Sequence, residues 1–235
     1  MNEFWAAIAG AIVGGLIAFG IQVIALREAR KERIRDAAEK QKALGHALIF
    51  KVIGIYSHLR QLNLHLQDAA ARMPKGTGLS WRAVLPIVNS PDRVHFTTDE
   101  MVMLLGLKNA DLFNDLVEMD ARHNATIAAS EAYKEYRLAL MATLPSEVSG
   151  NVGTVGLTRD QMRVFAPKMV ELDDLLRQSS AQSEQQEREA WSVLLRLRDI
   201  LTAKIGLTIT LEQKPDSEMR WTVAGAVPSP DGRLQ

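Results

Sequence analysis

The sequence predicts an all-α protein in which a single N-terminal transmembrane helix continues into an elongated antiparallel helical bundle of coiled-coil type. Three observations support this fold class. An uncharged apolar segment lies near the start of the chain, apolar residues then recur at heptad spacing over long stretches, and strand-type runs of valine, isoleucine and threonine are scarce. Alanine, leucine, glutamate, glutamine and arginine, which favour helices, are plentiful.

The apolar segment, residues 4–26, carries no charged side chain. As a helix it would extend about 34 Å, which is enough to cross the roughly 30 Å hydrocarbon core of a membrane. Asn2 and Glu3 precede it and basic residues follow it, which is the reverse of the order in a cleaved signal peptide. The segment is therefore predicted to be a retained transmembrane helix.

A cluster of basic residues directly after the span predicts its orientation. Lysine and arginine remain on the cytoplasmic side, so residues 27–235 are predicted to be cytoplasmic and residues 1–3 external. The expected location is the cell inner membrane, in a single pass. A topology signal is favoured over a lipid-headgroup site because Glu28, Glu32 and Asp36 dilute the positive charge. The cluster comprises Arg27, Arg30, Lys31, Arg33 and Arg35.

Small residues recur at every fourth position of the span, and one polar residue continues the same stripe. Small side chains let two transmembrane helices approach closely, and a polar side chain can hydrogen-bond across their interface. The stripe predicts self-association of the span and hence a homo-oligomer. The alternative is that glycine and alanine are simply common in transmembrane helices. The stripe consists of Ala6, Gly10, Gly14, Ala18 and Gln22.

Changes in apolar spacing divide the rest of the chain into four segments. Apolar residues recur every three or four positions from Leu48 to Met73, which predicts one continuous helix from the membrane to about residue 72. Proline and glycine then interrupt the pattern. The segments are a juxtamembrane stalk with the first bundle helix at 27–73, a short-helix connector at 74–108, an antiparallel helical hairpin at 109–206 and a C-terminal tail at 207–235.

Capping signals place the starts of the later helices. Thr97 with Glu100, and Thr158 with Gln161, have the spacing of a capping box. Ser80 is a further candidate cap, for a short helix within the connector. We therefore expect two short helices in the connector, the second beginning after Thr97.

The hairpin is predicted as two long helices at 109–144 and 159–205. A kink or short break is expected in the second at Pro167. The loop at 146–157 contains three glycines and has no regular period. Residues 207–211 could form a short strand, but no partner strand is evident, and the tail beyond them is expected to be loosely ordered.

Both hairpin helices lose their leucines at mid-length. If the helices pair antiparallel, His123 and Thr126 face Ser179 and Ser183. Because two separate stretches become polar at the same height, we predict a buried or partly wet hydrogen-bonded layer that fixes helix register. The alternative is that no third helix covers this level and the four residues face water.

Composition limits the possible functions. Lysine plus arginine and aspartate plus glutamate number 28 each, and this neutral balance argues against a protein that coats nucleic acid. The absence of cysteine excludes thiolate metal sites and cysteine nucleophiles. Five histidines provide little material for a metal site. No metal, cofactor or small-molecule substrate is inferred.

Arg60 and His65 have the spacing R-x4-H within one predicted helix. This six-residue motif resembles that of HEPN-type ribonucleases, some of which are anchored by a single amino-terminal span. The resemblance implies that the arginine and histidine together reach a scissile phosphate, usually across a dimer. The heptad seam accounts for the same helix through Leu59, Leu62 and Leu66, and it leaves Arg60 and His65 on flanking, solvated positions.

These observations favour a non-enzymatic function, that of a single-pass membrane-anchored cytoplasmic scaffold or sensor. Its expected partners are membrane lipid, further copies of the chain and an unidentified protein, but not nucleic acid. A second hypothesis is an oligomerising membrane effector, pore-forming or membrane-disrupting, that its cytoplasmic bundle gates. A third is a membrane-anchored HEPN-like ribonuclease in which Arg60 and His65 are catalytic.

Overall fold

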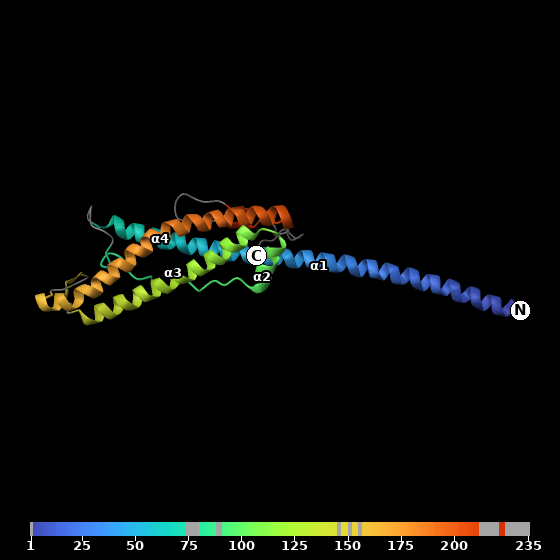
Figure 1. The fold of residues 1–235 in the computed structure, drawn as a ribbon, viewed down its shortest axis with the longest axis horizontal. Coiled ribbons are helices and arrows are strands. Elements are labelled where there is room, and N and C mark those ends of the chain that lie inside the picture. Colours follow the sequence, from blue (N-terminus) through green and yellow to red (C-terminus); the bar gives the residue numbers. More distant parts are fainter. Residues whose placement is uncertain are drawn as a thin grey trace, which may run out of the picture.

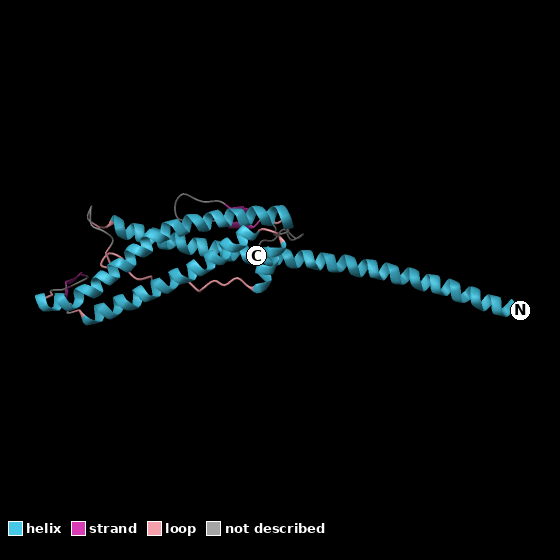
Figure 2. Ribbon diagram, viewed as in Figure 1, coloured by secondary structure: helices cyan, strands magenta, loops and turns pink. Residues whose placement is uncertain are grey.

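The computed structural model describes a predominantly helical protein, which confirms the all-α class (Figure 2). Its helices are α1 (Asn2–Ala71), α2 (Thr98–Gly106), α3 (Ala110–Thr143) and α4 (Arg159–Ile205). Its strands are β1 (Glu147–Ser149), β2 (Val152–Thr154), β3 (Ile209–Leu211) and β4 (Trp221–Val223). The described backbone covers residues 2–73, 80–87, 91–144, 147–149, 152–154, 157–211 and 221–223, and the described side chains are those of 19–73, 80–87, 91–144 and 157–211.

The first helix, α1, is one continuous element of 70 residues and therefore about 105 Å long. Its N-terminal part extends as a free arm beyond the other helices, with the N-terminus at the far end (Figure 1). Side chains from Phe19 to Ala43 are almost all exposed, and buried side chains recur from Gly45 onward. The arm and the first bundle helix are thus one helix, as the sequence pattern predicts.

The predicted transmembrane segment lies within this arm. In the part of the chain whose side chains are described, no helix contains an 18-residue stretch apolar enough to span a membrane. Residues 4–18 of the predicted span lie outside that part.

The bundle consists of the second half of α1 together with α3 and α4, which lie side by side (Figure 1). The chain direction of α4 is opposite to that of α1 and α3. Arg196 of α4 pairs with Asp115 near the start of α3, and Asn63 late in α1 bonds Glu187 in the middle of α4. The predicted helical hairpin is therefore antiparallel, and the first helix packs against it.

Two apolar clusters form the core, one near the arm and one at the opposite end. The proximal cluster contains residues 48–59 of α1, 112–119 of α3 and 190–201 of α4, with contributions from α2 and from the start of the tail. The distal cluster consists of Leu62, Leu66, Ala69, Trp81, Val84, Tyr133, Leu140, Leu144, Met169, Leu172 and Leu176. On α3 and α4 a mainly polar stretch separates the two clusters, whereas on α1 the apolar seam continues from Leu59 to Leu62.

Both predicted capping boxes are present. The Thr97 hydroxyl accepts from the Glu100 amide at 3.3 Å, and the Glu100 carboxylate accepts from the Thr97 amide at 2.6 Å. Thr158 and Gln161 make the corresponding pair of bonds at the start of α4. These side chains satisfy amides that would otherwise lack an intrahelical partner.

Three details of the predicted secondary structure are wrong. Residues 81–83 form a turn, with the Ala83 amide bonded to the Ser80 carbonyl, so the helix predicted after Ser80 is absent. The helix α4 continues through Pro167, so the short break expected there is absent. Pro167 is exposed, and water can therefore bond the carbonyl that lacks a proline N–H partner. In the loop at 146–157, β1 pairs antiparallel with β2.

The C-terminal tail also differs from expectation. Residues 209–211 form a strand, β3, and this strand has a partner in β4 at 221–223. The partner lies within the stretch predicted to be loosely ordered. No short hairpin-turn signal connects the two strands, because nine residues separate them, and a local pattern therefore does not reveal the pairing.

Candidate functional site

A layer of polar side chains crosses the bundle between its two apolar clusters. Of the five buried polar or charged side chains in the described part of the chain, four lie at this level. The apolar clusters stop at Met119 on α3 and resume at Tyr133, and on α4 they leave a similar gap between Leu176 and Ala190. We define the polar layer as His58 and Asn63 of α1, His123 and Thr126 of α3, and Ser183, Gln186 and Glu187 of α4.

Two histidines form the centre of the layer. His58 Nδ1 and His123 Nε2 lie 2.9 Å apart, and the rings meet edge to face at an interplanar angle of 83°. His58 is buried and His123 is only 1 % exposed. The Nδ1 atom of His123 is also buried, and it has no hydrogen-bond partner among the described residues.

Burial sets the protonation of both rings. It lowers the pKa of His58, because the charged form loses hydration in the interior. Burial also lowers the pKa of His123, and the adjacent His58 adds to the effect, bringing that pKa to about 4. At neutral pH the bridge is therefore a hydrogen bond between two neutral imidazoles, one donating and one accepting.

Two further hydrogen bonds of the layer connect the other pairs of helices. Asn63 Nδ2 donates to Glu187 Oε2 at 2.6 Å and joins α1 to α4. Thr126 Oγ1 donates to Gln186 Oε1 at 2.9 Å and joins α3 to α4. Together with the histidine bridge, the layer thus provides one hydrogen bond between each pair of long helices. Such contacts fix the relative register of helices, because sliding one helix would break them.

The residues predicted for this layer have different partners. His123 and Ser183 are both 1 % exposed, but Ser183 bonds the Ser180 carbonyl of its own helix. Thr126 bonds Gln186, and Ser179 is half-buried beside two surface cavities. Sequence reasoning missed the contribution of α1, although a helix that contacts two neighbours also buries positions beside its heptad seam.

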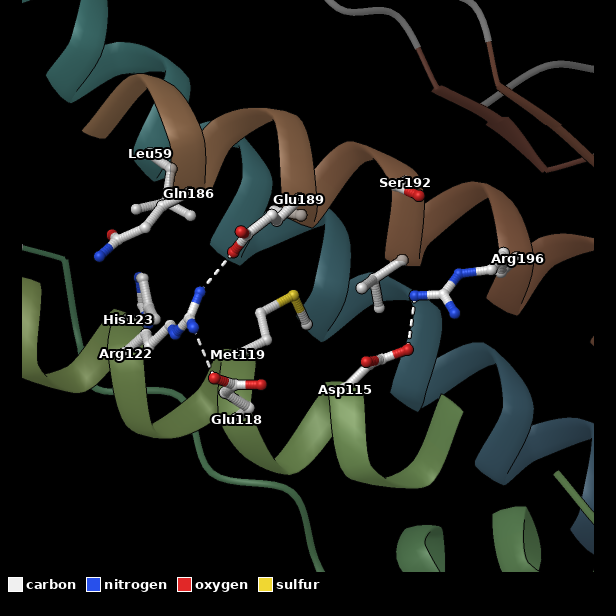
Figure 3. A pocket seen from close by; sticks show the side chains of 12 residues that line it. Leu59, Asp115, Glu118, Met119, Arg122, His123, Gln186, Glu189, Ser192 and Arg196 are labelled. Carbon is white, nitrogen blue, oxygen red and sulfur yellow. Dashed lines mark hydrogen bonds and ion pairs between the residues drawn. The ribbon is translucent and has the colours of Figure 1, made fainter. Parts of the chain in front are cut away.

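A cavity of about 270 Å³ opens beside the layer between α3 and α4 (Figure 3). Arg122 at its edge pairs with Glu118 of α3 at 2.5 Å and with Glu189 of α4. Arg196 of α4 pairs with Asp115 of α3, also at 2.5 Å. The cavity edge is therefore closed by ion pairs, and its apolar surface comes from Leu59, Met119, Ala190 and Val193.

The ribonuclease-like residues have structural partners. Arg60 Nη1 donates to the Tyr56 hydroxyl at 3.1 Å, one helical turn away. His65 Nε2 donates to the Leu85 carbonyl at 2.8 Å and so connects the segment after Trp81 to α1. Within the described residues, no group of three or more histidine, aspartate or glutamate side chains is arranged to hold a metal ion.

The membrane-related residues are only partly described. Ala6, Gly10, Gly14 and Ala18 of the association stripe lie outside the described side chains, and Gln22 is exposed on the arm. The basic residues of the arm are also exposed, and one of them, Arg35, pairs with Glu39 at 3.1 Å.

The chain matches no protein-family model, no curated protein and no solved structure.

Proposed function

We propose that this protein is a single-pass membrane-anchored cytoplasmic scaffold or sensor, which acts through a protein partner or through further copies of itself. The observation that supports this proposal most is a set of exposed apolar side chains within residues 19–26 of the arm. Phe19 is 66 % exposed, and it is followed by Ile21, Ile24 and Leu26, all more than half exposed. Burying each such side chain contributes roughly 1.5–3 kcal/mol, so this surface favours lipid over water.

The polarity of the arm changes directly after Leu26. Residues 27–43 are mainly charged, and nearly all are exposed. Basic side chains at this boundary favour the cytoplasmic side of a membrane. As a helix, the charged stretch would hold the bundle about 25 Å from the end of the apolar segment. A bundle at this distance leaves its sides accessible to a partner, as a scaffold or sensor requires.

The chemistry of the bundle supports an interaction role over catalysis. The polar layer uses its side chains to join the three long helices to one another. The arginines beside the cavity are paired with carboxylates. These contacts are typical of groups that determine helix register and orientation.

A pair of topology reporters tests the proposal. A reporter that is active only in the cytoplasm, fused after Gln235, should be active, and a periplasm-dependent reporter at the same position should be inactive. Replacing the basic residues of the arm by glutamine should give mixed orientations, because lysine and arginine determine retention. These residues are Arg27, Arg30, Lys31, Arg33 and Arg35.

The matched control replaces Arg177 and Arg188, which are exposed on α4, by glutamine. It should leave the orientation unchanged. An active periplasmic reporter on the unmodified chain, or a soluble protein with no membrane fraction, would contradict the proposed anchor.

A further inference from the structure

We propose that the His58–His123 bridge is an acid-sensitive joint, in which uptake of a proton releases α3 from α1 while both helices stay packed against α4. The bridge is a direct polar contact between α1 and α3. This inference goes beyond the proposed function, and its chemistry is independent of where the chain is anchored.

The positions of the ring hydrogens explain the sensitivity. In the neutral pair, His123 can donate from Nε2 to His58 Nδ1 and keep its buried Nδ1 free of hydrogen. A proton on His123 places a hydrogen on that Nδ1. A proton on His58 forces His123 to accept at Nε2, which moves the hydrogen of His123 to Nδ1. Every singly protonated bridge therefore contains a buried N–H without an acceptor, as well as a buried charge.

A second proton abolishes the bridge. When both rings are doubly protonated, all four ring nitrogens are donors and none can accept. The two positive charges then also repel each other across a short distance. Separation of α3 from α1 relieves both costs, because it exposes the rings to water.

Other charged groups around the layer are engaged elsewhere. Within the described part of the chain, the two rings have no hydrogen bond or ion pair apart from the one that joins them. Consequently no carboxylate directly stabilises an imidazolium here. The charged or titratable groups at this level are Arg60 of α1, Asp120 and Arg122 of α3, Glu187 and Glu189 of α4, and His95 of the preceding segment.

Each of these groups has its own partner. Asp120 bonds Asn124 at 2.9 Å and lies 3.8 Å from His95, which is on the exposed side of α3. Glu187 bonds Asn63. Arg122 and Glu189 pair with each other across the cavity.

The arrangement of the helices allows this joint to open. Both α1 and α3 pack closely along α4, whereas the backbones of α1 and α3 approach each other much less. The cavity between α3 and α4 borders the joint, since Leu59 and His123 both line it. Loss of the bridge therefore lets α3 move relative to α1 without breaking the contact of either helix with α4.

The depressed pKa values are consistent with this geometry. Both histidines are neutral at pH 7 and take up protons only as the pH falls below the ordinary value of 6.5. Opening of the joint restores their hydration and raises their affinity for protons, so acid shifts the bundle towards the open form.

A distance measurement between α1 and α3 tests the joint. The chain has no cysteine, so Gln61→Cys and Ala128→Cys allow two specific spin labels on exposed positions of the full-length protein. At pH 7.5 the label–label distance distribution should be narrow. On titration to pH 4.5 it should broaden and shift to longer distances. An unchanged distribution over this range would overturn the proposal.

Two sets of variants identify the responsible groups. In the same labelled chain, the double variant His58→Gln/His123→Gln should abolish the acid-induced change in label–label distance. All carboxylates remain in this variant, so the result separates the histidines from acidic groups that also titrate in this range. His95→Gln, which removes an exposed histidine, should leave the response intact. A response that persists in the double variant contradicts the proposal.

Histidine ring resonances of the unsubstituted chain provide a check that does not depend on whether the double variant folds. Two rings should titrate below pH 6.5, over the same range as the distance change. An increase in the label–label distance without titration of these two rings would also contradict the proposal. The topology reporters test the membrane anchor independently of this result. The experiments therefore distinguish failure of the acid-sensitive joint from failure of the proposed anchor.

Discussion

The two halves of α1 belong to one helix but lie in opposite environments. In the arm, Ile34 is 62 % exposed and its neighbours are mainly charged, while in the bundle Leu48 and Val52 are fully buried. Pairs such as Arg35–Glu39 support the helix locally where no other described element covers it. In the bundle, a heptad seam places side chains against α4. Helix continuity therefore gives no information on where tertiary packing begins.

The two halves of α1 should differ most in how much stability is lost when an apolar side chain is truncated. Leu48→Ala should lower the free energy of unfolding by about 2–5 kcal/mol, because it leaves a cavity in the proximal cluster. Ile34→Ala should change it by less than about 0.5 kcal/mol. Urea titration of the full-length protein in detergent measures both. Equal losses would mean that the arm is packed as tightly as the bundle.

Acid should also lower the stability of the bundle. His58 and His123 have pKa values below the unfolded value of 6.5, so the unfolded chain binds more protons between pH 6.5 and about 4. The stabilisation by the neutral pair is therefore complete above pH 6.5 and is lost as the pH falls towards 4. The change attributable to His123 is at most about 3 kcal/mol. Urea midpoints at several pH values measure it, and the double glutamine variant should show a smaller slope.

Removing one histidine should have a somewhat smaller effect at neutral pH. His123→Leu leaves His58 Nδ1 without its partner in the interior and should cost roughly 1–3 kcal/mol. His95→Leu, at an exposed position, should be nearly neutral. The melting temperature of the full chain at pH 7 distinguishes the two variants. An unchanged value for His123→Leu would show that the layer does not stabilise the bundle.

Glycine substitutions locate the point where α1 enters the bundle. The Cβ of Gly54→Ala would have no described atom within 4 Å apart from its chain neighbours and the backbone of its own helix, so the substitution should stabilise the helix by about 0.5–1 kcal/mol. Gly45→Ala should gain less, because its Cβ would lie 2.8 Å from methyl groups of Ile205 and Leu207. Thermal unfolding compares the two variants. A larger gain for Gly45→Ala would contradict the close approach of α4 to α1 at this position.

The elements that local patterns determine were predictable from the sequence. The continuous α1, the helices of the hairpin and the caps at Thr97 and Thr158 all depend on residues close together in the chain. The pairing of β3 with β4 and the turn after Ser80 were not predicted, because they depend on tertiary contacts or on distant partners. Pro167 shows a related limit, since an exposed helix position tolerates proline better than the local rule implies.

The polar layer illustrates the same distinction within the candidate site. The loss of leucines on α3 and α4 pointed to the level of His123, which the structure buries. Its partner His58 was not predicted, because the apolar seam of α1 continues through that level. Only the packing of α1 beside α3 brings the two rings together.

The central claim, that the apolar segment at residues 4–26 anchors this protein in a membrane, is tested most directly by alkaline carbonate extraction of membranes that contain the full-length chain. The anchor predicts that the protein remains in the membrane pellet, and that a chain beginning at residue 27 is released to the supernatant. Release of the full-length chain by carbonate would contradict the anchor.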